Sequence, residues 1–133
     1  MIVVLDASAV IAYLHGEPGG TVVDEALLDS AISCSMHAIN LYEVYYDFLR
    51  RTDATTALGF VRALRQTGLS VREDMDETLW LDAGRLKVAY GLSVADTFAI
   101  ALARRLSGEL MSADHHEFDP VAEAGECRIR FIR

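Results

Sequence analysis

Cysteine is scarce in this chain of 133 residues, which has only Cys34 and Cys127. The two lie far apart in the sequence, one in a strand-like run and the other near the C-terminus. A disulfide framework or a zinc site needs more cysteines at closer spacing. We therefore expect reduced thiols and a cytoplasmic protein.

Long apolar runs are also missing. The longest, such as Val94 to Ala103, are interrupted by polar residues well short of the roughly 18 apolar residues that a membrane span needs. The start, Met1 to Asp6, lacks the basic segment of an export signal. Leu, Ile, Val and Phe still supply 39 of the 133 residues, so the chain can bury a core. We expect one domain over residues 1–133, without a membrane contact.

Basic side chains are few, with 12 against 20 acidic ones and a net charge of −8. This balance excludes functions that need a broadly basic nucleic-acid-binding surface. A nuclease that holds cations remains compatible with it, because such an enzyme concentrates carboxylates. Lys87 is the only lysine, and the eleven arginines carry a planar group suited to phosphate.

Strand-like and helix-like segments alternate along the chain. Ile2–Leu5 is a continuous apolar run, typical of a strand buried on both faces in a parallel sheet. Similar runs predict strands over 31–35, 69–72, 110–112 and 129–132. Apolar spacing and capping residues predict helices over 8–14, 21–28, 37–51, 57–64, 76–90 and 93–106. The order predicts an α/β sandwich around a mostly parallel sheet, with ligands at the carboxyl ends of the strands.

Four carboxylates stand in apolar surroundings. Asp6 and Asp114 each follow a predicted strand, and Glu43 and Asp96 lie in largely apolar helices. An unpaired buried carboxylate costs several kcal/mol, so four of them favour a shared cation. Oxygen ligands without Cys or His favour Mg²⁺ or Mn²⁺.

Each acid also has a simpler interpretation. Asp6 fits the cap of the helix that follows it, and Ser93 with Asp96 fits a capping box. Glu43 fits a solvent-facing helix position, and Asp114 fits a loop. The joint occurrence of two acids at strand ends and two on adjacent helices favours a site.

The motifs resemble those of the PIN domain and, within it, the VapC-type toxin ribonucleases of toxin–antitoxin pairs. The resemblance rests on Val4–Val10, Asn40–Glu43, Ser93–Ala103 and Met111–Asp114, with Phe118 downstream. It covers nearly the whole chain, and the four motifs in this order are more specific than any one alone.

The resemblance implies a three-layer fold with four or five strands and Mg²⁺- or Mn²⁺-dependent cleavage of RNA. It implies that Asp6 and Asp96 are primary metal ligands, that Glu43 binds metal or orients the attacking water, and that Asp114 acts through a water. It also implies a homodimer and a VapB-like antitoxin with a basic C-terminal segment. In-line displacement at phosphate is the chemistry that such a metal site supports.

Several nearby residues have two interpretations. Ser8, Asn40 and Ser112 are placed to orient the ligands or water, or make ordinary cap and turn hydrogen bonds. Asp47 reaches the rim of the site or pairs with Arg50 or Arg51.

Further polar and aromatic residues are harder to place. We expect His115 and His116 to lie in a loop, where adjacent histidines seldom share a ligand. Three interpretations are open for Tyr42, Tyr45 and Tyr46: they stack on a base, pack in the core or contact a second copy of the chain. In the last case Phe48 and Phe60 belong to the same contact. Trp80 has the same core or dimer interpretations.

Two other functions compete with the nuclease. One is a catalytically silent PIN-like binding domain that keeps its acids for structure. The other is a phosphotransfer module with Asp after its first strand, which fits poorly because Asp6-Ala7-Ser8 lacks a second Asp and Lys87 lies in a helix.

Overall fold

The computed structural model describes residues 1–133 as five strands and seven helices. The strands are β1 (Ile2–Leu5), β2 (Ser33–His37), β3 (Ser70–Arg72), β4 (Glu109–Ser112) and β5 (Ile129–Phe131). The helices are α1 (Ala7–His15), α2 (Gly20–Leu28), α3 (Ala38–Arg51), α4 (Ala54–Arg65), α5 (Glu77–Tyr90), α6 (Val94–Arg105) and α7 (His115–Glu123). No helix is both long enough and apolar enough to cross a membrane.

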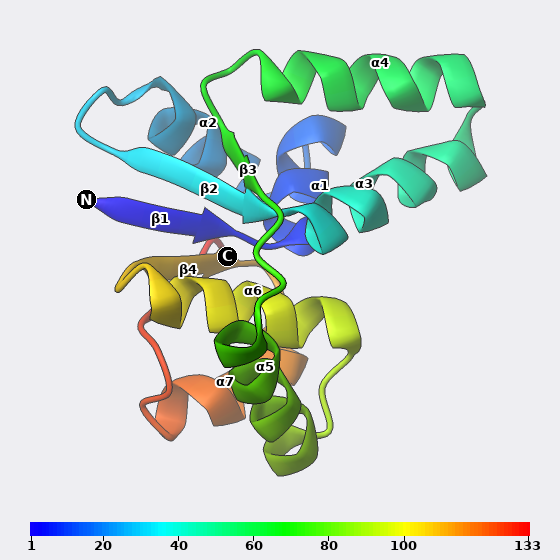
Figure 1. Cartoon of the computed structure of the whole chain (residues 1–133). Coiled ribbons are helices and arrows are strands. Elements are labelled where there is room, and N and C mark those ends of the chain that lie inside the picture. Colours follow the sequence, from blue (N-terminus) through cyan, green and yellow to red (C-terminus); the bar gives the residue numbers. More distant parts are fainter.

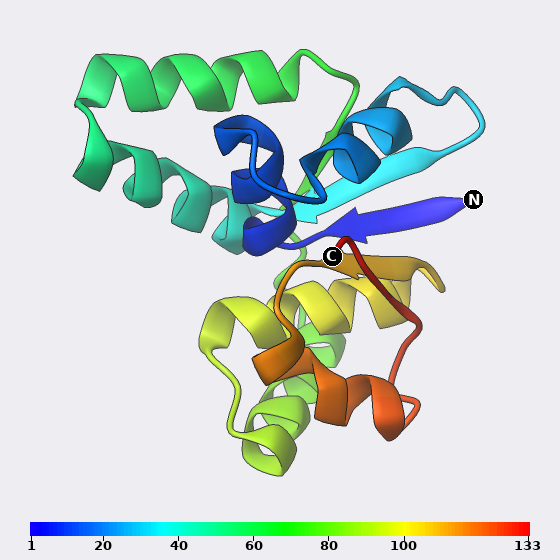
Figure 2. The same ribbon diagram turned by 180° about the vertical axis from the view of Figure 1, so that it is seen from behind.

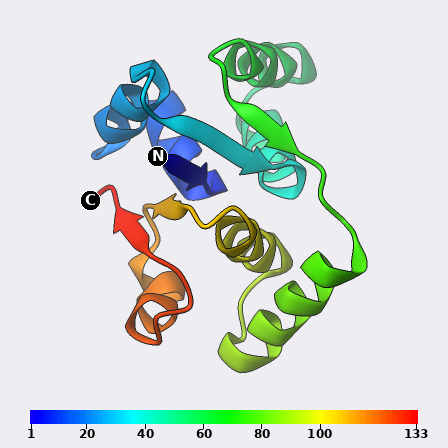
Figure 3. The ribbon, with the colours of Figure 1, turned by 60° about the vertical axis from the view of Figure 1, so that its left-hand side comes forward.

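The five strands form one sheet in the order β3-β2-β1-β4-β5, and every neighbouring pair is parallel. The first strand therefore lies at the centre, with Val4 paired to Ser35 of β2 and to Leu110 of β4. This confirms the predicted α/β sandwich, with five strands and no antiparallel pair. In Figure 3 the arrows of β1, β2 and β3 point the same way.

Helices cover both faces of the sheet. Figures 1 and 2 show α1 to α4 on one side and α5 to α7 on the other. The alternating side chains of β1 divide between the two layers: Val3 and Leu5 pack with α1 to α4, and Val4 packs with α5 to α7. Contacts between α3 and α6 join the two helix layers.

The helices α3 and α4 form an antiparallel pair that extends away from the sheet (Figure 1). The ring of Phe48 stacks on Phe60 of α4 at 4.4 Å between centroids, and this contact holds the pair together. The same ring also stacks on His15 of α1, at 4.5 Å between centroids. Phe48 is 3% exposed and belongs to the core. The prediction that places Phe48 in a contact with a second copy is therefore wrong.

The predicted strand over 31–35 begins two residues too early. Asp29 holds the preceding residues in a turn, with its side chain accepting from the Ala31 N–H at 2.8 Å and its carbonyl from the Ile32 N–H at 3.0 Å. Ladder pairing starts only at Ser33, whose N–H donates to the carbonyl of Met1.

Two helix starts also differ from the predictions. The first helix begins at Ala7, one residue before the predicted start at Ser8, and is capped by Asp6. The expected loop over His115 and His116 is instead the start of α7, capped by Asp114. Phe118 and Val121, three residues apart on α7, are fully buried and dock this helix against the sheet.

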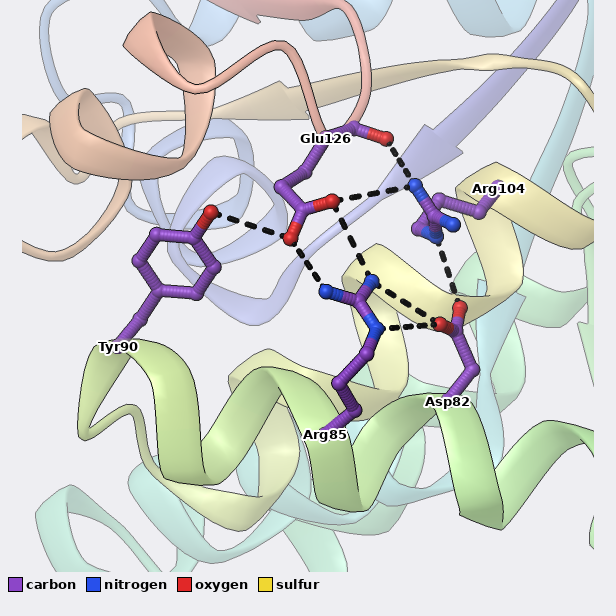
Figure 4. Close-up of polar contacts among 5 residues, drawn as sticks. All are labelled: Asp82, Arg85, Tyr90, Arg104 and Glu126. Atoms are coloured by element: carbon purple, nitrogen blue, oxygen red, sulfur yellow. Dashed lines mark hydrogen bonds and ion pairs between the residues drawn. The ribbon is translucent and has the colours of Figure 1, made fainter.

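A polar network ties α5, α6 and the turn before β5 together (Figure 4). Arg104 donates to Asp82 at 2.8 Å and to the carbonyl of Glu126 at 2.6 Å. Arg85 binds the carboxylates of both acids, at 3.1 Å and 2.7 Å, and the Tyr90 hydroxyl donates to Glu126 at 3.1 Å. The network lies at the C-terminal end of α6 and fixes that helix from the end opposite to Asp96.

Candidate active site

Two of the four acids follow adjacent strands. Asp6 comes directly after β1, and Asp114 comes two residues after β4. The strands are paired through Leu5 and Met111, and the Asp6 N–H donates to the Met111 carbonyl at 3.2 Å. Because carboxyl ends of parallel strands meet at one edge of the sheet, both acids reach the same place.

The carboxylate of Asp6 is buried and held by hydrogen bonds. One oxygen caps α1 by accepting from the Ala9 N–H at 2.8 Å. The Ser8 hydroxyl donates to the same oxygen at 2.8 Å, and the Ser112 hydroxyl donates to the other at 2.6 Å. Burial raises the pKa of Asp6 to about 6, although these hydrogen bonds lower it. The carboxylate of Asp6 therefore caps α1 and also lies among the residues of the candidate site, so the two interpretations made from the sequence do not exclude each other.

The two serines also shape the turn that carries Asp114. The Ser8 hydroxyl accepts from the Ala113 N–H at 2.9 Å, and the Ser112 hydroxyl accepts from the Asp114 N–H at 3.0 Å. Asp114 in turn caps α7 by accepting from the Glu117 N–H at 3.0 Å. The side chains expected around the acids therefore link Asp6 to Asp114 through hydrogen bonds.

Asn40 connects the starts of two helices that carry site residues. Its side chain is fully buried; the carbonyl oxygen accepts from the Ala7 N–H at 3.2 Å, and the amide donates to the Ala95 carbonyl at 3.1 Å. Ala7 follows Asp6 and Ala95 precedes Asp96. One amide thus sets the backbone beside both acids.

Asp96 lies in the first turn of α6, and its N–H donates to the capping hydroxyl of Ser93 at 3.2 Å. Burial is the main cause that raises the pKa of Asp96 to about 7. The negative charges of Asp6, Glu43 and Asp114 add to the rise. The fold therefore brings all four acids within electrostatic reach of one another.

Glu43 projects from the second turn of α3 and is partly buried. Burial raises its pKa, and the charges of Asp47 and Asp114 raise it further. The Tyr46 hydroxyl donates to Glu43 Oε1 at 3.5 Å and lowers the pKa. A carboxylate with a raised pKa is a stronger proton acceptor than an ordinary one.

None of the four acids forms an ion pair with a basic side chain, whereas many other acids do. Four mutually repelling carboxylates with hard oxygen atoms match the chemistry of Mg²⁺ or Mn²⁺. No three His, Cys, Asp or Glu side chains are assembled as a metal-binding group. The acids are thus neighbours without forming a closed ligand cage.

Two other polar groups near the site have partners of their own. Asp47 accepts a hydrogen bond from Arg50 at 2.9 Å and forms an ion pair with Arg51 at 3.3 Å, so both pairings considered from the sequence are present. His115 has Asp119 at one ring nitrogen, at 2.9 Å, and the carbonyl of the C-terminal residue at the other, at 2.8 Å. Because both nitrogens are occupied, His115 has no free nitrogen to offer a metal ion.

Comparison with known proteins agrees with this geometry. The family model described as "PIN domain" matches residues 3–124, which include all four acids. The chain belongs to the PIN-domain family. No curated protein matches the sequence.

Solved PIN-like structures share the fold at low sequence identity. VapBC2 of Rickettsia felis, bound to a promoter DNA fragment, has a TM-score of 0.79 at 14% identity, with 98% of each chain covered. VapBC-1 of Haemophilus influenzae has a TM-score of 0.77 at 15% identity, covering 99% of this chain and 98% of the other. VapC20 of Mycobacterium tuberculosis, a sarcin–ricin loop cleaving toxin, has a TM-score of 0.70 at 18% identity, covering 90% and 94%.

Proposed function

We propose that this PIN-domain protein is a Mg²⁺- or Mn²⁺-dependent endoribonuclease and the toxin of a VapBC-type pair. The observation that carries the proposal is the group of four acids without basic partners, two of them at the carboxyl ends of adjacent central strands. The PIN-domain match and the toxin–antitoxin assemblies among proteins of the same fold support it. Its site of action is the cytoplasm, where both cysteines stay free thiols.

A bound cation would supply a polarised water and neutralise charge at the scissile phosphate. Asp6 and Asp96 would hold the cation, the first fixed by the two serine hydroxyls and the second by its place beside Asn40. Asp114 would act through a water. Glu43 would bind metal or, with its raised pKa, accept a proton from the attacking water.

The test is cleavage of labelled RNA with Mg²⁺ or Mn²⁺, and with EDTA in place of metal. We expect Glu43→Gln and Asp6→Asn each to lose most of the activity, because each removes a charge from the site. Glu25→Gln is the matched control, since this glutamate lies exposed on α2. A wild-type protein that binds metal but cleaves no RNA would favour the catalytically silent binding domain instead.

The partner that fits this site is a VapB-like antitoxin with a basic, initially disordered C-terminal segment. An antitoxin arginine can bridge two of the four carboxylates and displace the cation. The net charge of −8 speeds the encounter at low salt, so the association rate should fall as salt rises. Replacing that arginine with glutamate should release the nuclease; full inhibition by the altered antitoxin would refute this mode.

We also propose a homodimer. The exposed apolar side chains that offer a contact lie on α5, where Trp80, Leu81 and Val88 are 47%, 56% and 89% exposed around a surface cavity of about 590 Å³. Gly84 lies between Trp80 and Val88 on the same face of the helix and leaves room for a second helix. Light scattering at micromolar concentration should give twice 14.6 kDa, and a monomer mass would refute the proposal.

A further inference from the structure

The outer face of α3 carries a stripe of exposed aromatic and basic side chains. Tyr42, Tyr46 and Arg50 follow one another at intervals of four residues, so they share one side of the helix. Tyr42 is 64% and Tyr46 39% exposed, and the Arg50 side chain is 68% exposed. The two tyrosine rings meet edge to face, 5.3 Å apart. None of these three residues is part of the core.

The stripe begins beside the candidate active site. The hydroxyl of Tyr46 contacts Glu43 Oε1 at 3.5 Å, and Glu43 lies one residue after Tyr42. Arg50 lies seven residues beyond Glu43, which is about 10 Å along a helix axis. A nucleic-acid strand with one phosphate at the acids would reach this face with its neighbouring nucleotides.

A buried carboxylate places the arginines at the far end of the stripe. Asp47 is 5% exposed; it accepts a hydrogen bond from Arg50 at 2.9 Å, forms an ion pair with Arg51 at 3.3 Å and contacts the His15 ring at 3.3 Å. His15 is itself fixed by stacking on Phe48. Arg50 and Arg51 carry two positive charges against the one negative charge of Asp47, so this group has a net positive charge although the whole protein has a charge of −8. Both arginine side chains keep about half or more of their surface exposed for an anion.

We propose that this face of α3 binds the single-stranded RNA that flanks the scissile phosphate, an inference that rests on the proposed function. Tyr42 and Tyr46 stack on bases, and Arg50 and Arg51 bind backbone phosphates. Asp47 is a positioning residue that holds both guanidinium groups in place. A second copy of the chain fits this face less well, because pairing would bury the arginines, while α5 offers a more apolar surface.

The first experiment measures binding without cleavage. Protein with Asp96→Asn is titrated against a fluorescein-labelled, mixed-sequence single-stranded RNA, and the Kd is read from anisotropy over a range of salt. We expect Arg50→Ala to raise the Kd and to reduce the slope of log K against log salt by about 0.7, the value of one phosphate contact on a single strand. Arg62→Ala is the matched control, because Arg62 is an exposed arginine of α4; it should change neither.

Tyrosine variants test the stacking. Tyr42→Ala and Tyr46→Ala should each raise the Kd about 5-fold or more, the lower end of the contribution of one stacked base. Tyr42→Phe should bind as before, since the ring is kept. The same RNA in a duplex should bind less tightly and be insensitive to Tyr42→Ala, because paired bases are not free to stack. In cleaving protein, Asp47→Asn should raise KM, whereas a general loss of folded enzyme would lower kcat and leave KM unchanged.

The outcomes separate this inference from the proposed function. RNA binding that none of the Tyr42, Tyr46 and Arg50 variants changes, in a protein that does cleave RNA, overturns the inference alone. Loss of a dimer on Tyr42→Ala, with an unchanged Kd for RNA, overturns it in favour of a second copy. A wild-type chain that cleaves no RNA, but whose binding depends on these residues, overturns the proposed function and supports the inference.

Discussion

Neutralising Asp6 should stabilise the metal-free protein at neutral and higher pH. The pKa of Asp6 rises from 3.8 to about 6 on folding, mainly through burial. The folded protein therefore holds a proton that the unfolded chain has already lost, and stability falls as pH rises from about 4 to about 6. A shift of this size corresponds to about 3 kcal/mol above pH 7 and to about half of that at pH 5.

Asp6→Asn removes this cost and keeps the hydrogen bonds. The amide oxygen can still accept from the Ala9 N–H, and the amide nitrogen can donate to the Ser112 hydroxyl. We expect the variant to be up to about 3 kcal/mol more stable than wild type at pH 8 in EDTA, and about 1.5 kcal/mol more stable at pH 5. His115, whose pKa is also raised, weakens both proteins equally as pH rises, so its effect cancels in the difference.

The assay is urea unfolding at pH 5 and pH 8, in EDTA and then with Mg²⁺. Mg²⁺ should stabilise wild type by about 2.7 kcal/mol at a concentration 100 times its Kd, and stabilise the variant less. We reason that burial and the other acids disfavour the charged form of Asp6. A variant no more stable than wild type at pH 8, or a stability difference that does not grow with pH, would refute this.

Three further predictions follow from the site and its supports. Asp96→Asn should abolish most of the rise in melting temperature that Mg²⁺ or Mn²⁺ produces, and calorimetry that detects no divalent binding to wild type would contradict the metal site. Asn40→Ala should lower the free energy of unfolding by about 2–4 kcal/mol, because it leaves a buried N–H and a buried carbonyl unpaired; urea unfolding measures this. Arg104→Leu should cost only about 1 kcal/mol and leave RNA cleavage unchanged, because its ion pairs are partly exposed and lie at the other end of α6 from the site. A cleavage rate that falls with the Arg104 variant would mean that the network controls the site.

The order of elements along the chain was predictable because hydrophobic periodicity reports local structure. The apolar run Ile2–Leu5 and the cap Ser93 identify elements that the structure contains. The helix α7 was not predictable in the same way. Its first turn holds two histidines and its interior holds Pro120, and the cap by Asp114 and the burial of Phe118 and Val121 stabilise it as a helix.

The candidate site shows a different limit. Sequence places Asp6 and Asp114 after strands, but it does not show that those strands are neighbours, because strand order depends on tertiary packing. The same limit applies to Asn40, whose two bonds join segments 33 and 55 residues away in the chain. Phe48 shares the helical spacing of the buried Leu41 and Val44, but its stacking on Phe60 depends on the return of α4, which the sequence does not show.

The caps of α1 and α7 are made by the same carboxylates that belong to the candidate site, Asp6 and Asp114. Removing either side chain therefore destabilises the start of a helix and also removes a candidate metal ligand. A descendant of this protein that had lost its activity would still need a side chain that caps a helix, Asp or Asn, at both positions. A capping side chain at these positions in a related sequence thus reports the fold, whereas Glu43, which caps no helix, is the better marker of a working enzyme.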